Sequence, residues 1–569
     1  MGFMRNGFYR AILLMAAIFG LVTMGNRVSA QSSAPVLRIA NSSLLARVFW
    51  SNNGYYHLLQ TAPNLTDSNA WVSIASGFPF MFALSNDNNT IIQLGSASAT
   101  NNELYWDQIK YPGNSFFRLK QPDFLPLSSF DIFYDGLLEF TQSSSLTLFG
   151  AVHANGPINV GTSAQINFLQ TVTCTGQIAA PFMDGISTGW IPGNPAAWNT
   201  AFEGTPPNLT NVPPLVLWTA TNNYHTLIDI PPMVENPTVF PGSARLFNQA
   251  SVVLLITNAV VGGNPAVKLT LQTAVNGAPP GADPSAVFFF TTNAQPGWLA
   301  TNLPFLSLTN QFYDAREYKT NIVAQIDIGV LGNWLQTNVS VQGKMPMAAS
   351  VYPTILFVAD LRNHLPLQMN AVRLVNGTVL PANSGHGFTV ATPNPLYVKG
   401  HYNTQLAGNS GTSAGTSDTT YTVPAALFCD ALTLLSYHWS DSASFNFTYY
   451  AGNPYYAATP SNTVNGVIVT GNVPTTDNTV SNFSGGVHNL VRLLEDWSSQ
   501  YLYLNGSRAR LWTSQTATNK FRNPYGFIGA PLNGYYNPPT RRYSYDLKLL
   551  FLTNIPPGVP FLKLSGTSP

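Results

Sequence analysis

The stretch LTLFGAVHANGPINVGTSAQINFLQTVTCTGQI, from Leu146 to Ile178, carries the clearest structural pattern in the chain. Apolar and polar residues alternate within it, and glycines interrupt the alternation. Strict alternation is typical of strands with one buried face. Apolar residues also return at every sixth position, namely Leu148, Ala154, Val160, Ile166, Val172 and Ile178. Strands at a hexapeptide step predict a β-helix-like stack, in which each turn covers the apolar face of the one before.

The alternative to this stack is plain antiparallel β-structure. Because 45% of the 569 residues are hydrophobic, six apolar residues at one fixed step also arise by chance in a chain of this length. The alternation itself fits both arrangements. Both alternatives predict a mainly β protein.

The N-terminus has the features of an export signal. Arg5 and Arg10 are followed by an apolar run that is shorter than the ~20 residues of a membrane span. Small residues precede a predicted cleavage site between Ala30 and Gln31. We therefore expect residues 1–30 to be a signal peptide, with an uncleaved anchor helix as the alternative. The mature protein is then expected in the periplasm, on the outer surface or outside the cell, without a membrane span.

Composition excludes several classes of partner. Only 9% of residues are charged and the net charge is +1, so no field attracts nucleic acid or an anionic membrane. Aromatic residues make up 12% of the chain, which favours strands.

The chain has two cysteines, Cys174 and Cys429. In an oxidising compartment they can form a disulfide. The alternative is two independent buried thiols, and the alternation around Cys174 predicts that its side chain points inward.

We expect five segments. Residues 1–30 form the signal, and residues 35–120 form a β-sandwich in which a turn at 52–54 joins residues 46–50 to 55–60 as a hairpin. The remaining three are the first β-helix-like turns at 128–180, a Pro-rich segment with a smaller α+β insertion at 181–345, and a C-terminal β-rich region at 346–569 that continues the stack. Within the insertion, residues 251–256 and 267–271 predict a buried hairpin.

Two segments resemble helices. Residues 312–335 form the best helix candidate, since acidic residues near the start suit a helix N-terminus, although the β-branched run at 322–328 also fits a strand. The densest group of charges lies at its start and consists of Asp314, Arg316, Glu317 and Lys319. We interpret this group as a capped helix start with local ion pairs, and binding of a sugar or a partner is the alternative.

The second helix is expected at Val487–Trp497 and carries Arg492, Glu495 and Asp496. Adjacent carboxylates point in different directions on a helix, so Glu495 and Asp496 make a poor acid and base pair. Farther along the chain, the pair Arg541-Arg542 is expected to hold the C-terminal tail through a carboxylate, and Asp546 is the candidate.

After residue 371 short apolar strands end repeatedly at turn residues. The expected turns are Asn376-Gly377, Gly400, Gly471 and Asn505-Gly506. These strands predict further turns of the stack that begins at Leu146. An independent C-terminal β-domain is the alternative.

Residues 50–119 resemble a β-sandwich module common in large exported proteins of some Gram-negative bacteria. The resemblance rests on Trp50, on the pattern Y-x-L-x-Q-x-x-x-N-L from Tyr56 to Leu65, on Trp71 and on FFRL from Phe116 to Leu119. The resemblance implies no particular chemistry.

Residues 128–562 resemble large exported envelope proteins of Gram-negative bacteria of the pilus-assembly-like, minor-pilin-like type. The matching blocks are HANG at 153–156, ARLFNQA at 244–250, FYDAREYK at 312–319, AVRLVNG at 371–377, ATPNPLYVKGHYN at 391–403, PAALFCDALTLLSYHW at 424–439, SGGVHNLVRLLEDW at 484–497, LNGSRARLW at 504–512 and YYNPPTRRYSYD at 535–546. The resemblance implies a β-rich surface or periplasmic protein with no established catalytic activity. An ordinary export signal stands here in place of the pilin helix, which argues against polymerisation.

Catalytic and metal motifs are missing from the sequence. It has no H-E-x-x-H, paired C-x-x-C or phosphate loop, and the closest histidine pair, His386 and His401, has no nearby carboxylate. We therefore expect a non-enzymatic envelope or surface structural protein with no cofactor, whose partners are envelope proteins or surface glycans. The alternatives are a carbohydrate-binding or adhesive protein and a polysaccharide-active β-helix enzyme, which would need convergent carboxylates.

Overall fold

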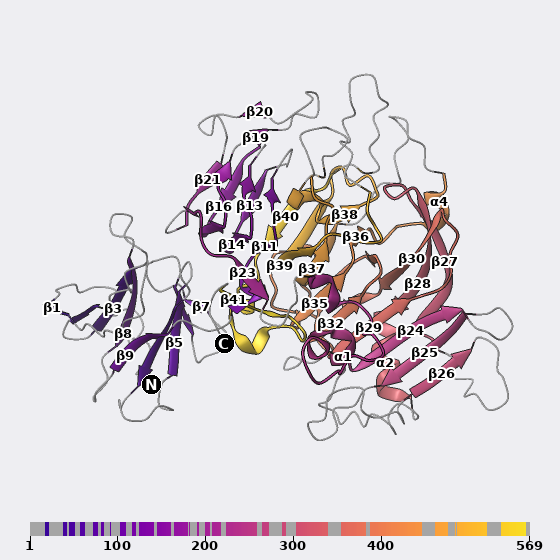
Figure 1. Cartoon of the computed structure of the whole chain (residues 1–569), viewed down its shortest axis with the longest axis horizontal. Coiled ribbons are helices and arrows are strands. Elements are labelled where there is room, and N and C mark those ends of the chain that lie inside the picture. The colour runs from indigo at the N-terminus through magenta and orange to yellow at the C-terminus, as the bar shows by residue number, and fades with distance from the viewer. Residues whose placement is uncertain are drawn as a thin grey trace, which may run out of the picture. The chain divides into compact units, whose positions relative to one another are not determined.

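The chain is mainly β-structure in its computed structural model, and its large sheets are parallel (Figure 1). Before residue 125 the structure describes strand backbone alone. The described residues are 18–21, 38–41, 45–51, 57–62, 72–77, 81–84, 91–92, 103–109, 116–120, 125–140, 145–160, 164–179, 181–182, 191–192, 200–204, 208–217, 223–258, 265–271, 287–291, 303–338, 354–382, 387–446, 461–475, 484, 486–519, 536 and 538–564.

The chain divides into two compact units, the first made of residues 1–123 with 170–172 and 202–209, the second of the remaining residues. In the first unit, strands run in two antiparallel sheets ordered β1-β2-β3-β8 and β7-β6-β5-β4-β9. Their bounds are β1 (Ile18–Leu21), β2 (Arg38–Asn41), β3 (Leu45–Ser51), β4 (His57–Ala62), β5 (Val72–Gly77), β6 (Met81–Leu84), β7 (Ile91–Ile92), β8 (Glu103–Ile109) and β9 (Phe116–Lys120).

The hairpin expected between residues 46–50 and 55–60 is wrong. Strand β3 pairs with β2 and β8, whereas β4 pairs with β5 and β9 in the other sheet. The segment between β3 and β4 therefore joins two sheets. Alternation and a turn sequence identify two strands, but they do not identify the partner of each strand.

The second unit begins with strands that repeat every twenty residues. Ile132 pairs with Val152, Leu138 with Ile158 and Leu146 with Ile166, all in parallel register. Three sheets result, ordered β11-β14-β17, β12-β15-β18 and β13-β16-β21. The bounds are β11 (Ile132–Tyr134), β12 (Leu138–Glu139), β13 (Leu146–Leu148), β14 (Val152–Ala154), β15 (Ile158–Asn159), β16 (Ile166–Phe168), β17 (Val172–Cys174), β18 (Ile178–Ala179) and β21 (Thr200–Phe202).

The hexapeptide step is therefore a fragment of a longer repeat. Of its six apolar residues, all except Ile178 are buried, so the alternation predicted the inward side correctly. Each twenty-residue unit contains three short strands. A step of six residues separates the starts of the first and second strands, but the segment between the second and third strands is longer, so a fixed step of six describes only part of the unit.

Glycines mark one turn of this repeat at twenty-residue intervals, at Gly136, Gly156 and Gly176. A Cβ added at Gly156 would lie 2.5 Å from the backbone carbon of Gly136, and one at Gly176 would lie 3.0 Å from Pro157. Successive turns thus approach each other more closely than a side chain permits.

The longest sheet of the second unit contains the ordered strands β17-β14-β11-β39-β37-β35-β32-β29-β24-β25-β26 (Figure 1). From β17 to β24 every pairing whose register is resolved is parallel. The added bounds are β24 (Val252–Asn258), β25 (Pro265–Leu271), β26 (Val287–Thr291), β29 (Ile355–Asp360), β32 (Phe388–Thr392), β35 (Ala425–Cys429), β37 (Asn462–Gly471) and β39 (Tyr501–Trp512). The antiparallel pairing of β24 with β25 confirms the hairpin predicted from the sequence.

A second sheet follows the order β27-β28-β30-β33-β36-β38 and is parallel from β28 onward. Strands β31 and β34 pair with each other, β34 also pairs with β37, and β40 pairs with β39. Their bounds are β27 (Leu306–Asp314), β28 (Lys319–Asp327), β30 (Gln368–Val375), β31 (Gly377–Val379), β33 (Leu396–Lys399), β34 (Tyr402–Gln405), β36 (Leu432–Leu435), β38 (Val491–Leu493) and β40 (Thr540–Ser544).

Short elements complete the described part of the chain. They are β10 (Leu125–Pro126), β19 (Pro181–Phe182), β20 (Ile191–Pro192), β22 (Asn208–Leu209), β23 (Leu215–Leu217), β41 (Phe561–Leu564), α1 (Leu246–Gln249), α2 (Ile328–Thr337), α4 (Asp441–Ser444), and the 3-10 helices η2 (Leu127–Ser129), η4 (Tyr224–Leu227), η5 (Gly242–Ala244), η8 (Gly486–Asn489), η9 (Leu547–Leu550) and η10 (Leu552–Asn554). None of the helices described is long and apolar enough to cross a membrane.

Of the strands at 128–180, β11, β14 and β17 belong to the same sheet as β39, β37 and β35 of the C-terminal region, whereas the others form two separate sheets. Their spatial order differs from the order in the sequence, because β11 pairs with β39 and the strands from β24 onward lie on the other side of β39. Strands β24 to β26 therefore lie at one end of this sheet, and β27 and β28 lie at one end of the second sheet.

Asn505-Gly506 was expected to be a turn, and this expectation is wrong. The dipeptide lies inside β39 and pairs with Asn465-Gly466 of β37. Both glycines have positive φ angles, and at this point β39 changes partner from β40 to β11. The dipeptide therefore marks the point at which β39 exchanges one neighbouring strand for another within the same sheet. Asn376, by contrast, does separate β30 from β31, which begins at Gly377.

Both expected helices are corrected by the structure. Residues 312–327 complete β27, a tight turn and β28, and the helix α2 begins only at Ile328, where Asp327 caps it by accepting the N–H of Val330 at 2.9 Å. The β-branched run pairs with β30, which explains the strand. Residues 487–497 contain η8 and β38 instead of one helix. In both segments neighbouring strands determine the structure more strongly than the local helix signals do.

Substituting Gly156 by Ala tests the close contact between successive turns. We expect the variant to lose ~1–3 kcal/mol of unfolding free energy, because the new methyl group meets the rigid backbone of Gly136. Gly329→Ala in α2 is the matched control, since its Cβ meets nothing closer than 3.5 Å and alanine favours helix. Urea unfolding measures both, and equal midpoints for the two variants would contradict the close-contact interpretation.

Candidate functional site

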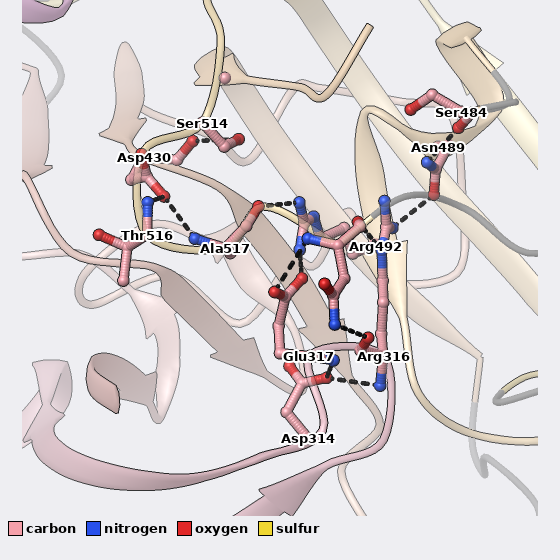
Figure 2. A network of polar contacts seen from close by, with 12 residues as sticks. Asp314, Arg316, Glu317, Asp430, Ser484, Asn489, Arg492, Ser514, Thr516 and Ala517 are labelled. Carbon is pink, nitrogen blue, oxygen red and sulfur yellow. Dashed lines mark hydrogen bonds and ion pairs between the residues drawn. The ribbon is translucent and has the colours of Figure 1, made fainter. Parts of the chain in front are cut away.

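Four of the charged residues singled out from the sequence lie in a buried polar network inside the second unit, namely Asp314, Arg316, Glu317 and Arg492 (Figure 2). Asp314 ends β27 and organises the turn to β28. Its Oδ1 accepts the N–H groups of Arg316 and Glu317 at 2.9 and 3.0 Å, and its Oδ2 accepts the hydroxyl of Tyr397 at 2.5 Å. The group is thus a hairpin turn, and the expected helix start is wrong. Lys319 begins β28 and is half-buried.

Burial, followed by the charge of Glu317, raises the pKa of Asp314. Burial also raises the pKa of Tyr397, and the neighbouring Asp314 raises it further. Tyr397 therefore remains protonated, and its hydroxyl donates a hydrogen bond to Asp314. The side-chain amide of Asn321 donates a hydrogen bond to the Tyr397 oxygen at 3.0 Å. This chain of hydrogen bonds joins the turn to β33.

Glu317 forms a buried ion pair with Arg492 of β38. The side chains are 3% exposed or less, so each charge depends on the other for compensation. The second oxygen of Glu317 accepts the N–H of Asn519 at 3.1 Å, and Arg492 also donates to the carbonyl of Ala517. The expected local ion pairs are therefore replaced by a pair between segments that are 175 residues apart.

Arg316 reinforces the same connection. It donates to Oδ1 of Asn489 at 2.5 Å and to the carbonyl of Asn519 at 3.2 Å. The amide of Asn519 donates back to the carbonyl of Arg316 at 2.9 Å. Figure 2 shows the turn at 314–317 facing Arg492 and the segment at 514–517.

Asp430 holds the other end of this segment. Its carboxylate accepts the N–H groups of Gln515, Thr516 and Ala517, the last two at 3.0 Å. Burial alone would raise the pKa of Asp430, but the hydrogen bonds from His225 and from these three N–H groups outweigh burial and lower it. The carboxylate is therefore ionised and fully engaged.

His225 of η4 connects Asp430 to a further segment. Its Nδ1 lies 2.7 Å from Asp229 and its Nε2 lies 3.4 Å from Asp430. Burial lowers the pKa of His225, but the hydrogen bonds and charges of the two aspartates prevail and raise it to about 9. His225 is thus charged at neutral pH, and each of its two ring nitrogens carries a proton.

Neither Asp430 nor His225 was identified from the sequence. Asp430 interrupts the apolar run PAALFCDALTLL, and a lone carboxylate in such a run needs a buried partner. That signal was available for Asp430. His225 lies 205 residues away in an irregular segment, and no pattern connects the two.

Glu495 and Asp496 have different surroundings and different partners in the structure, as expected, but they do not lie on a helix. Glu495 is fully buried and accepts the N–H and hydroxyl of Ser436, both at 2.6 Å. Burial raises the pKa of Glu495 to about 7, against the lowering effects of the Ser436 hydrogen bonds and Lys399. Asp496 is half-buried and accepts the N–H of Ser498 at 2.9 Å.

Asp546 caps η9 and accepts the hydroxyl of Thr419 at 3.0 Å and the N–H of Lys548 at 3.0 Å. Arg542 instead lies over the ring of Tyr501, with Cζ 5.3 Å from the ring centroid. The expected pairing of Arg542 with Asp546 is therefore corrected.

The two cysteines are separate buried thiols, which was the alternative left open by the sequence. The thiol of Cys174 donates to the carbonyl of Gly176 at 3.3 Å, and that of Cys429 donates to the hydroxyl of Thr470 at 3.5 Å. The structure thus contains no disulfide between Cys174 and Cys429. Burial raises the pKa of both thiols, to about 11 for Cys174 and about 12 for Cys429.

Of the two histidines considered as a metal pair, His386 lies outside the described residues. His401 accepts the N–H of Thr463 at 3.1 Å. Within the part of the chain described, no three His, Cys, Asp or Glu side chains are grouped as metal ligands. The predicted cleavage residues Ala30 and Gln31 also lie outside the described residues.

The network therefore holds six chain segments together. They are residues 225–229, 314–321, 397, 430, 489–492 and 514–519. Each oxygen of Asp314, Glu317 and Asp430 already accepts a bond from the protein. These hydrogen bonds and ion pairs therefore hold the backbone of the segments in place.

Arg492→Met tests the ion pair. We expect a loss of ~3–5 kcal/mol of unfolding free energy, because Glu317 is left as an uncompensated buried charge. The exposed Arg542→Met is the control and is expected to stay within ~0.5 kcal/mol of the parent. Urea unfolding measures the changes. Combining Glu317→Gln with Arg492→Met should cost less than the sum of the single losses, and strict additivity would count against the pair.

The His225 pair predicts a pH dependence. Because the folded-state pKa is raised from 6.5 to about 9, its contribution is complete below pH 6.5 and is lost as the pH rises through 9. The difference in unfolding free energy between the parent and His225→Gln should therefore shrink between pH 6.5 and 9. Chemical unfolding at a series of pH values measures it, and a difference that grows over this range would refute the assignment.

Comparison with known proteins gives no relative: no family model, no curated protein and no solved structure matches this chain.

Proposed function

We propose that this chain is a non-enzymatic, exported structural protein of the cell envelope or cell surface. The observation that supports this most directly is the use of its buried charges. Asp314, Glu317 and Asp430 are ordinarily candidates for proton transfer, yet their oxygens are bonded to Tyr397, Arg492 and backbone N–H groups. Carboxylates used in this way stabilise one arrangement of the chain.

We further propose that the parallel strands form a β-helix-like stack. Three sheets built from successive strands at a twenty-residue register are what such a stack requires. The pairing of β11 with β39 extends the stack from the C-terminal strands to residues 132–179. A long, internally bonded stack of this type suits a structural role because each turn buries the face of its neighbour.

In this proposal the first unit is a separate β-sandwich module. Its two antiparallel sheets agree with that architecture, and cleavage after Ala30 removes β1, which leaves sheets of three and five strands. The resemblances of both halves to exported Gram-negative proteins favour an envelope or surface location, with envelope proteins or surface glycans as partners. A pilus- or secretion-associated role belongs to the same proposal.

The polysaccharide-active enzyme is less well supported than the structural protein. An enzyme of that class needs a carboxylic acid and a carboxylate that reach one substrate. The buried carboxylates at 314, 317 and 430 are engaged with the protein, and Glu495 is fully buried against Ser436. Carbohydrate binding without catalysis is the stronger second function, and the exposed Tyr501 beside the half-buried Tyr503 on β39 favours it.

Expression of the full chain in a Gram-negative host tests the export proposal. We expect the protein in the periplasmic or extracellular fraction with Gln31 as its first residue, as determined by mass spectrometry of the intact protein. The Ala30→Arg variant should retain the leader, since a large charged side chain does not fit the small-residue cleavage site. Recovery of the parent in the cytoplasm with residues 1–30 intact would overturn the proposal.

A further inference from the structure

Tyr501, Tyr503 and Arg542 form an outward surface on the neighbouring strands β39 and β40, here called the tyrosine face. The alternating residues Leu502 and Leu504 are buried at 0% and 2% exposure, so the tyrosines point to the opposite side. Tyr501 is 42% exposed, Tyr503 is half-buried and Arg542 is exposed. The strands lie side by side in Figure 1.

The three side chains are close enough to act together. Tyr503 and Arg542 are register partners in the parallel pairing of β39 with β40. The ring centroids of Tyr501 and Tyr503 are 6.3 Å apart, and the guanidinium carbon of Arg542 lies 5.3 Å from the Tyr501 centroid. A planar cation stacked on a ring is held in place at small entropic cost.

Arg542 differs from the buried arginines of the protein. Arg245, Arg362, Arg373, Arg492 and Arg508 each form an ion pair with a carboxylate. Among the described residues no carboxylate forms an ion pair with Arg542. An exposed guanidinium in a fixed position is suited to bidentate binding of a carboxylate or sulfate from outside.

A polar loop is anchored next to this face. The N–H of Gly415 donates to the Thr463 hydroxyl at 2.8 Å, and Thr463 is the register partner of Tyr503. The Asn505 amide donates to the carbonyl of Thr416 at 3.0 Å. The exposed residues 415–417 of this loop provide backbone and hydroxyl groups near the tyrosines, and the next residue, Asp418, adds an exposed carboxylate whose charge Lys548 opposes.

We infer that the tyrosine face binds an acidic polysaccharide. Aromatic rings offer apolar surfaces on which sugar rings stack, and their hydroxyl groups remain free for polar contacts. The guanidinium supplies the charge complementarity that selects a carboxylate-bearing or sulfated chain over a neutral one. This inference rests on the second proposed function, carbohydrate binding, and names its substrate class. It does not depend on the structural role, because it concerns a surface that the buried network does not use.

The test uses affinity electrophoresis of the full-length protein in native gels that contain alginate, a polymer of uronic acids, with dextran as the neutral control. We expect retardation by alginate and none by dextran. Tyr501→Ala and Arg542→Gln should each weaken the alginate affinity by about tenfold, which corresponds to a loss of about 1.4 kcal/mol for each contact removed. The effect of Arg542→Gln should diminish as salt is added.

Tyr437→Ala is the matched control, because Tyr437 is 61% exposed and lies outside the face. It should leave the alginate affinity unchanged. Urea unfolding of every variant separates lost binding from lost folding, and Tyr503→Ala replaces Tyr501→Ala if the latter unfolds. Failure of the parent to bind alginate, equal binding of dextran, or an equal loss in Tyr437→Ala would overturn the inference.

Discussion

The pairing of β11 with β39 is the constraint on which the second unit depends. It joins the strands at 132–179 to those at 355–512, and Arg508 and Asp131 form a buried ion pair at this joint. Asp131 also accepts the N–H groups of Phe149 and Gly150 at 3.1 and 3.2 Å, so the joint fixes the next turn of the chain. Without this pairing, β11 and β39 would each have an unpaired edge on the side where they now meet. Their pairing removes both exposed edges.

Bends inside strands allow this joint to form. Gly466 and Gly506 let β37 and β39 each pair with one neighbour before the bend and a different one after it. The side chains beside them form a ladder, in which Asn505 donates to Asn465 at 2.7 Å and Ser544 donates to Asn505 at 2.7 Å. These bonds satisfy polar groups at the point where β39 exchanges β40 for β11, while its pairing with β37 continues.

Sequence patterns predicted the strands better than their connections. Alternation identified the buried side of residues 146–174 and the hairpin of β24 and β25. The twenty-residue repeat was missed because its three strands are unequally spaced. The helices expected at 312–335 and 487–497 were inferred from local charges, and those charges in fact form contacts with residues far along the chain, such as Glu317 with Arg492. Local signals carry no information on partners at such separations.

The joint between β11 and β39 also has a consequence for biosynthesis. Asp131 and Arg508 are 377 residues apart, so a ribosome completes β11 long before it begins β39. During that interval the edge of β11 that faces β39 in the finished protein has no partner, and folding of the second unit is completed only once the C-terminal strands have been made. A prematurely terminated chain would expose that edge permanently, which makes it a substrate for chaperones or proteases.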